Sequence, residues 1–500
     1  MAATTFEAKS RNVIPRWRDS RTTRLTTELV SLGPKRTKTL DDQQFRQKYL
    51  DWEESRSIIS AAELLNAAIV LNKGAAAQTA AEYLVEAGKR IPDALLRAAK
   101  AILAPPDAQS GQLTFLPTLA SREHIRRLRH AIRQYPRNSL AWVDMSREYA
   151  STGQLEQARH TMEVAVALTP TNRFVVRSAA RLYVHLEDAA HAHKILVKAA
   201  SAHADPWLIA AELAVAPIAK VAPKFVFEAR RFLKAGNYAP IHLSEMASAL
   251  ATLEMSNGNN KQARKLFYKA LQEPTENTVA QVNWATEILG TIKMSPSVLE
   301  VPRLFEARSW GFYRAGQWRD ALDQSFGWLE DQPFSSRPAI HGSYIASSLL
   351  EDYDSAERIA RAGLEANPGE FGLLNNLTVA LARTGRVTEA VRYFGMINRS
   401  NLSAVHRIVW HATAGLLCFR NGQIEQARAL YGLAVDNAAG SEMESLRAQA
   451  ALARAAEELY AQTPEASEAK QTAIILAEAS ASPVIKALVA RISEIRPGGQ

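Results

Sequence analysis

The stretch from Asn138 to Pro170 predicts a pair of short amphipathic helices that cannot fold alone. Thr152 and Gly153 separate the two helices, and Pro170 ends the second. Apolar and small residues recur every three or four positions in each half: Trp142, Met145 and Tyr149, then Ala158, Met162 and Ala165. Because both helices have an apolar face and the hairpin is too short to cover them, the unit has to stack on copies of itself.

The spacing of prolines indicates where those copies lie. Prolines at positions 136, 170, 206, 240 and 274 follow one another at 34 or 36 residues, and those at 333 and 368 at 35. A helix-turn-helix period of 34 residues with Trp, Gly or Ala, Tyr, Ala, Phe and Pro at fixed offsets resembles the tetratricopeptide repeat family. The resemblance covers about residues 57–440. It implies an all-α fold, a right-handed α-solenoid superhelix whose first helices line a concave groove that holds peptide segments.

Departures from the period predict the organisation of the chain. The expected parts are a basic extended arm, disordered when free, at 1–40; a first solenoid half at 41–291 with a loop insertion at 105–117; a seam at 292–300; a second half at 301–440; and capping helices with a tail at 441–500.

The net charge of +9 belongs to two segments. Residues 1–40 carry +6 and residues 121–137 carry +5, so the rest of the chain carries −2. Within the arm, Pro15 favours an extended backbone between Ile14 and Trp17. These two apolar side chains, flanked by Arg16 and Arg18, are expected to dock on a second partner protein.

The second basic segment predicts a helix with five arginines on one face and apolar residues on another. The arginines are Arg122, Arg126, Arg129, Arg133 and Arg137, and the apolar stripe is Ile125, Leu128, Ile132 and Tyr135. Such a face suits phosphates or an acidic protein surface. In the repeat frame this is a second helix, so the alternative is a solvated arginine face on the convex side.

The repeat frame also selects exposed positions of the first helices as a partner-binding groove. These positions are Arg147, Arg177, Arg181, Arg303, Trp310, Tyr313, Arg314, Asn375, Asn376 and Arg383. Guanidinium groups bind carboxylates or phosphates in a bidentate manner, aromatic residues anchor interfaces, and amides can clamp a ligand's backbone. The alternative is a solvated groove with Trp310 packed between repeats.

The sequence contains no pattern typical of a catalytic or cofactor site. It has no phosphate-binding glycine loop, HExxH, paired CxxC or GxSxG, and Cys418 is its only cysteine. The sequence contains no run of 18 apolar residues, so it does not predict a membrane-spanning helix. We therefore expect no catalytic residue, metal or cofactor, and a non-enzymatic, cytoplasmic scaffold or adaptor that binds proteins within a multiprotein complex. The alternatives are a nucleic-acid-associated subunit that uses the arm and helix 121–137, and a regulator that senses a peptide or an anionic ligand.

Overall fold

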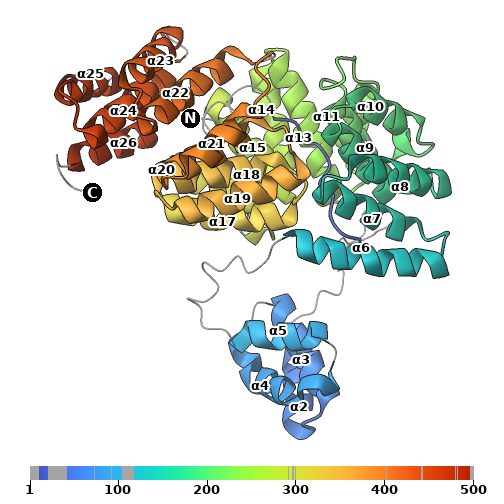
Figure 1. Cartoon of the computed structure of the whole chain (residues 1–500). Helices are drawn as coiled ribbons and strands as arrows, with labels where there is room; N and C mark the ends of the chain where they lie inside the picture. Colours follow the sequence, from blue (N-terminus) through green and yellow to red (C-terminus); the bar gives the residue numbers. More distant parts are fainter. Residues whose placement is uncertain are drawn as a thin grey trace. The chain divides into compact units, whose positions relative to one another are not determined.

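The computed structural model describes residues 11–20, 42–71, 74–91, 93–103, 117–290, 292–295, 298, 300–400, 402–440, 443–478, 480 and 482–495. Every regular element in these parts of the chain is a helix, as the sequence predicts (Figure 1). The chain divides into two compact units, unit 2 at residues 32–115 and unit 1 at residues 1–31 together with 116–500.

Unit 2 is a small helical unit with its own core. Its helices are α2 (Asp42–Glu54), α3 (Ile58–Leu71), η1 (Gly74–Ala77), α4 (Gln78–Ala87), η2 (Gly88–Arg90) and α5 (Asp93–Leu103). Leu64, Leu65 and Leu84 are fully buried in this core, and the ring of Trp52 lies 5.3 Å from that of Tyr83.

Unit 1 contains the longer series of helices. They are α6 (Pro117–Gln134), α7 (Ser139–Ser151), α8 (Leu155–Leu168), α9 (Arg173–His185), α10 (Ala189–Lys198), η4 (Ala202–Ala204), α11 (Pro206–Val215), α12 (Val226–Ala235), α13 (Pro240–Ser256), α14 (Asn260–Ala270), α15 (Glu276–Leu289), α16 (Phe305–Arg314), α17 (Trp318–Asp331), α18 (Ser336–Tyr344), the π-helical turn η6 (Ile345–Leu349), α19 (Tyr353–Ala366), α20 (Phe371–Arg383), α21 (Val387–Gly395), α22 (Ala404–Arg420), α23 (Ile424–Asn437), α24 (Glu444–Ala461), α25 (Ala466–Glu478) and α26 (Pro483–Glu494).

Consecutive helices pack as hairpins, and the first helices of successive hairpins also touch one another. The hairpins include α7 with α8, α13 with α14, α16 with α17 and α22 with α23, while α18, α20, α22 and α24 contact each other in sequence. In the hairpin from Asn138, the asparagine side chain caps α7 by accepting from the Ala141 amide at 3.2 Å. Ser146 then donates to the Ala158 carbonyl at 2.7 Å across the hairpin. The small serine permits the close approach that stacking requires.

One turn in this hairpin approaches a distant part of unit 1. Gly153, between α7 and α8, has φ +69°, and a Cβ added there would lie 2.3 Å from the carbonyl oxygen of Glu365. Helix α19, which carries Glu365, also contacts α6 and α7. Glycine is needed here for the left-handed backbone and for the close contact.

The expected boundaries coincide only in part with the observed units. The division between the units falls at the 105–117 insertion, most of which lies outside the described residues. The expected seam at 292–300 lies within unit 1, where Val298 is buried beside Val279 and Leu304. Past residue 440, α24 and α25 occur where capping helices are expected, and α26 follows them.

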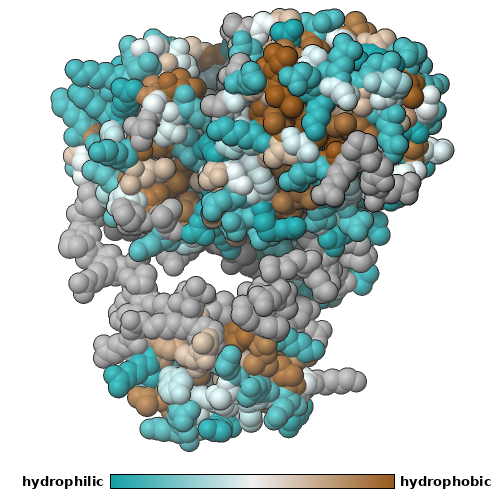
Figure 2. Space-filling model, turned by 90° about the vertical axis from the view of Figure 1, so that its left-hand side faces the viewer, coloured by the Kyte–Doolittle hydropathy of each residue, from teal (hydrophilic) through white to brown (hydrophobic). Residues whose placement is uncertain are grey.

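The surface in Figure 2 has separate hydrophobic patches among hydrophilic residues. The large apolar side chains that are exposed include Ile59 and Phe227, both at 73%. These two belong to different units, and scattered exposure of this kind is ordinary for a protein surface.

Candidate functional site

The described part of the arm, residues 11–20, has no helix or strand and lies among the helices of unit 1 as the dark-blue trace in Figure 1. Alternate residues are buried, namely Arg11, Val13, Pro15 and Trp17, and those between them are half-buried. A two-residue alternation is the pattern of an extended backbone that presents one face to a surface. The arm is therefore bound to unit 1 in the manner of a peptide ligand.

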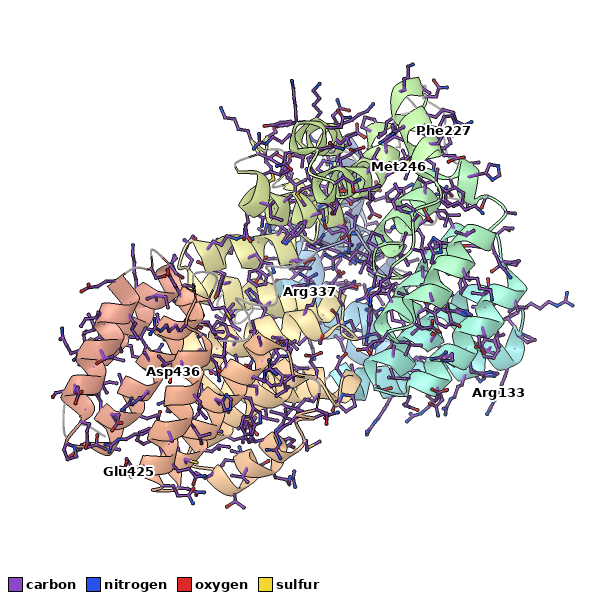
Figure 3. The ribbon with its side chains drawn as sticks, turned by 90° about the horizontal axis from the view of Figure 1, so that it is seen from above. Arg133, Phe227, Met246, Arg337, Glu425 and Asp436 are labelled. Atoms are coloured by element: carbon purple, nitrogen blue, oxygen red, sulfur yellow. The ribbon has the colours of Figure 1, made fainter. Side chains whose placement is uncertain are left out.

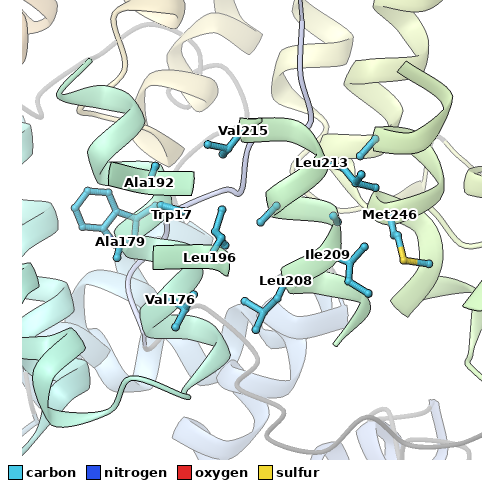
Figure 4. Close-up of a cluster of buried hydrophobic side chains, with 14 of the residues drawn as sticks. Trp17, Val176, Ala179, Ala192, Leu196, Leu208, Ile209, Leu213, Val215 and Met246 are labelled. Carbon is cyan, nitrogen blue, oxygen red and sulfur yellow. The ribbon is translucent and has the colours of Figure 1, made fainter. Parts of the chain in front are cut away.

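Trp17 is the apolar centre of this contact. Its side chain is 0% exposed, and its ring lies 5.1 Å from that of Phe334. It belongs to the same hydrophobic cluster as Ala179 and Leu196, which Figure 4 labels with it. Arg147 of α7 donates to the Trp17 carbonyl oxygen at 3.3 Å.

Arg11 makes the most complete polar contact of the arm. Its guanidinium donates to both carboxylate oxygens of Glu306 at 3.0 and 2.8 Å, and to Oε1 of Gln281 at 2.6 Å. Arg16 and Arg337 ion-pair with the same carboxylate. Two-pronged guanidinium–carboxylate pairing fixes orientation as well as charge. Glu306 thus gathers three guanidiniums around a group that is 4% exposed.

A second carboxylate cluster holds the other end of the arm. Arg18 donates to both oxygens of Asp331 at 2.6 and 2.8 Å and ion-pairs with Glu276 at 2.8 Å. Ser20 donates its backbone N–H and its hydroxyl to Asp144 at 2.9 and 2.5 Å. The arm is therefore held by carboxylates of four different helices, α7, α15, α16 and α17.

Side-chain amides of α15 bind the arm's backbone. Asn277 donates to the Ile14 carbonyl at 2.9 Å, and Gln281 donates to the Arg11 carbonyl at 2.6 Å. Contacts to main-chain oxygens hold an extended segment whatever its side chains are. We call the residues that hold the arm the arm site: Asp144, Arg147, Glu276, Asn277, Gln281, Glu306, Asp331 and Phe334.

Arginine partners favour the ionised form of Glu306 and Asp331, whereas burial raises the pKa of Asp144. Burial alone would raise the pKa of Glu306, but the three guanidiniums around it hold that pKa well below its usual range. Burial likewise opposes ionisation of Asp331, and hydrogen bonds from Arg18 nevertheless lower its pKa. The site is therefore adapted to positively charged side chains.

The structure places the arm residues expected to dock within the chain's own arm site. Trp17 is buried there, Arg16 and Arg18 are ion-paired there, and Ile14 is half-buried. The alternation explains why Val13, and not Ile14, is the buried aliphatic residue. In the observed arrangement these side chains are not free for a second partner.

Several of the expected groove arginines lie at or near the arm site. Arg147 belongs to it, and Arg303 ion-pairs with Asp331 at 3.3 Å at its edge. The Arg181 guanidinium lies 4.8 Å from the ring centre of Phe334. Burial is the main reason why its pKa is lowered, to about 9, with nearby cations adding to the effect. Arg177 lies elsewhere, where it ion-pairs with Glu245 at 2.7 Å.

Trp310 and Tyr313 are not exposed anchors. They are 6% and 5% exposed, and their rings lie 3.8 and 5.2 Å from that of His341. The two aromatic residues of α16 therefore pack against a residue of α18 in the next hairpin. Arg314 of the same helix ion-pairs with Glu287 at 2.6 Å.

The remaining groove residues belong to a different surface. Asn375, Asn376 and Arg383 line a cavity between the C-terminal helices of unit 1. Asn376 donates to the Ile340 carbonyl at 3.1 Å, and Arg383 ion-pairs with Glu457 at 2.6 Å. The structure does not bring these residues to the arm site.

The five arginines of the expected stripe are exposed, but Arg137 lies beyond α6, which ends at Gln134; the apolar residues at 125, 128 and 132 are buried. Tyr135 differs from the expected stripe because it lies beyond the end of α6 and is 67% exposed. Arg129 donates to the Tyr149 hydroxyl at 2.8 Å. Arg133 lies at the outer edge of the helices in Figure 3, whereas Arg337 lies toward their middle.

Sequence reasoning missed the residues that receive the arm, above all Glu276, Asn277, Gln281, Glu306 and Phe334. The only available signal was charge, since a basic arm accompanies a body of opposite sign. Within the described residues, no group of three or more His, Cys, Asp or Glu side chains is arranged to hold a metal ion. Among the helices of those same parts, none is long and apolar enough to cross a membrane.

Comparisons with known proteins add only distant likenesses. No protein-family model and no curated protein matches the chain. Among solved structures, yeast Tom70 matches 87% of this chain and 95% of its own at 13% identity and a TM-score of 0.31. The APC/C hetero-tetramer Cut9-Hcn1 matches 90% of this chain and 93% of its own at 10% identity and a TM-score of 0.39. The fold therefore rests on the hairpins described above: within the described residues the regular elements are helices, and in unit 1 they stack as hairpins, as expected for tetratricopeptide-like repeats.

Proposed function

We propose that this protein is a non-enzymatic interaction subunit whose arm site receives an extended, basic segment of a partner protein. Residues 11–20 of the chain itself are its resident occupant, which the partner's segment replaces. The observation that carries the proposal is the way in which the arm is held. Carboxylates bind its arginines, amides bind its carbonyls, and an apolar pocket takes its tryptophan.

The arm site also indicates the chemistry of the partner. The arm site favours a segment with one arginine on each side of a bulky aromatic residue. One arginine would pair with Glu306, and the other with Asp331 and Glu276. Asn277 and Gln281 require an extended main chain between them. A tethered arm competes at an effective concentration on the order of millimolar. A partner segment therefore binds only when it has higher affinity than the arm or when the arm is displaced.

The test uses a fluorescently labelled peptide with the sequence of residues 11–20 and the full-length Trp17→Ala protein, whose arm is weakened. Fluorescence anisotropy is expected to rise with this variant and to stay flat with the wild type. A peptide in which Trp17 is replaced by Ala is the matched control. Asp331→Asn in the protein should weaken binding of the unmodified peptide. Equal binding to wild type and variant, or no binding to a variant whose arm is released, would contradict the proposal.

A second candidate function uses the exposed arginines of α6. Nucleic acid would bind to this face of α6 and not to residues 11–20 of the arm, because the arginines at 11, 16 and 18 are paired with carboxylates. Binding of duplex DNA or RNA should then fall steeply with salt, and it should decrease in an Arg126→Glu, Arg133→Glu variant. A flat salt response would exclude this function.

A further inference from the structure

A cavity lies at the other end of unit 1, away from the arm site. Its volume is about 120 Å³. Its walls come from α20, α22 and α24, from the region of η6, and from the C-terminal helix α26. Helix α26 packs on α24 and η6, so it forms one wall of the cavity.

A rigid polar network forms part of the lining. Thr413 donates to the Asn375 side chain at 2.7 Å, and Asn376 donates to the Ser343 hydroxyl at 2.9 Å. The hydrogen bonds of these side chains are therefore made to one another. Tyr431, whose side chain is 1% exposed, also lines the cavity.

The charges of the lining favour an anion. Arg383 and Arg491 both line the cavity, and Glu351 is the acidic residue among the described lining residues. Arg491 donates to the carbonyl oxygens of Ser348 and Leu349 at 2.7 and 2.9 Å and ion-pairs with Glu351 at 3.4 Å. Two of these three partners are neutral.

Arg383 is held in place by the residues around it. It ion-pairs with Glu457 at 2.6 Å and lies 5.4 Å from the ring centre of Tyr460. Glu457 also pairs with Arg420 at 3.0 Å, so one carboxylate faces two guanidiniums. Arg383 is therefore fixed in the wall by its neighbours.

The rest of the lining is mainly apolar and includes Val379, Val409, Leu416, Leu452 and Leu488. We propose that this cavity binds a small amphipathic carboxylate, with its apolar body against these residues and its carboxylate toward Arg491. Binding would also stabilise α26, because that helix supplies one wall.

The test measures thermal unfolding of the full-length protein with decanoate, below its micelle concentration, and with decanol as the neutral control. Decanoate is expected to raise the melting temperature, and decanol to bind about tenfold more weakly. Arg491→Gln should weaken decanoate binding about tenfold, whereas Arg491→Lys should retain it. Lys486→Gln removes a charge from an exposed position of the same helix and should change nothing. Ala453→Phe should fill the cavity and abolish binding.

Three outcomes would overturn the proposal. The first is the absence of any decanoate effect on the wild type. The second is equal binding of decanoate and decanol, which removes the role of charge. The third is unchanged binding to Ala453→Phe, which places the ligand elsewhere. If Arg491→Gln does not fold, the comparison of decanoate with decanol and the Ala453→Phe variant still decide the question. None of these results depends on the arm site.

Discussion

Replacing Trp17 by Ala should release the arm from unit 1. The indole is 0% exposed and packs against Phe334 with ring centres 5.1 Å apart. Removing a fully buried tryptophan costs about 3–5 kcal/mol. The arm is an extended segment outside the helical hairpins, so this cost falls first on the equilibrium between bound and released arm. The released population should rise roughly 10²- to 5 × 10³-fold.

Limited digestion with trypsin measures this population, because the arm carries cleavage sites at Arg11, Arg16 and Arg18. When the arm reassociates faster than it is cut, the cleavage rate follows the released fraction. We expect cleavage after Arg16 and Arg18 to accelerate at least 100-fold in Trp17→Ala, up to the rate of the free peptide. Mass spectrometry identifies the bonds that are cut.

Tyr135→Ala is the matched control, since it removes an aromatic ring that is 67% exposed. It should change neither the cleavage rate nor the melting temperature. The reasoning would be refuted if Trp17→Ala left cleavage of the arm unchanged while lowering the melting temperature of the whole protein. That result would make the arm an inseparable part of the core, and no partner's segment could replace it.

Four other perturbations test the packing and charges of unit 1. Gly153→Ala should lower the melting temperature more than Gly258→Ala in scanning calorimetry. Both glycines have positive φ, where a side chain costs about 1–2 kcal/mol, but only at Gly153 would the added Cβ lie 2.3 Å from a carbonyl oxygen. Equal shifts would contradict this. Glu306→Gln should cost about 3–5 kcal/mol in urea unfolding and release the arm, because buried guanidiniums lose their common carboxylate; a loss below about 1 kcal/mol would argue against it. The pKa values of Glu306 and Asp331 are lowered in the folded protein. Their contribution to holding the arm is therefore complete above about pH 4.5 and is lost as the pH falls through the folded pKa. In acid, labelled arm peptide should lose its affinity for the Trp17→Ala protein. Burial lowers the pKa of His341 to about 3, so the free energy of unfolding should fall as the pH falls from about 6.5 toward 3, by roughly 3 kcal/mol at about pH 4. His341→Phe should reduce this pH dependence in urea unfolding. An unchanged dependence would show that His341 is not its source.

The helical hairpins could be predicted from the sequence because their signals are local. Met145, Tyr149 and Met162 recur at helical spacing, and all three are buried in the structure. Gly153 marks the turn between the two helices, where its φ is +69°. Such features depend on residues within one hairpin, which a single sequence contains in full.

The arm site could not be predicted in the same way. Arg11 and Glu306 are 295 residues apart, and Arg18 and Asp331 are 313 apart. Local periodicity carries no information on such pairs. It also placed Trp310 on an exposed face, although the ring packs against His341 of the next hairpin. Charge complementarity between arm and body was the one long-range signal, and it does not identify residues.

Residues 11–20 and helix α26 both pack against other helices of unit 1, but different forces hold them. The arm is bound by ion pairs to Glu306 and Asp331, and Trp17 is the largest of its buried apolar side chains. Helix α26 is bound by apolar packing, with Ile492 2% exposed, and Arg491 donates to neutral carbonyls. The arm has one internal backbone hydrogen bond, from the Ile14 N–H to the Asn12 carbonyl at 2.8 Å, whereas a helix keeps its own series of them when it dissociates. We therefore expect the arm to exchange with a partner segment of similar chemistry. We expect α26 to stay in place and to close over a bound small ligand.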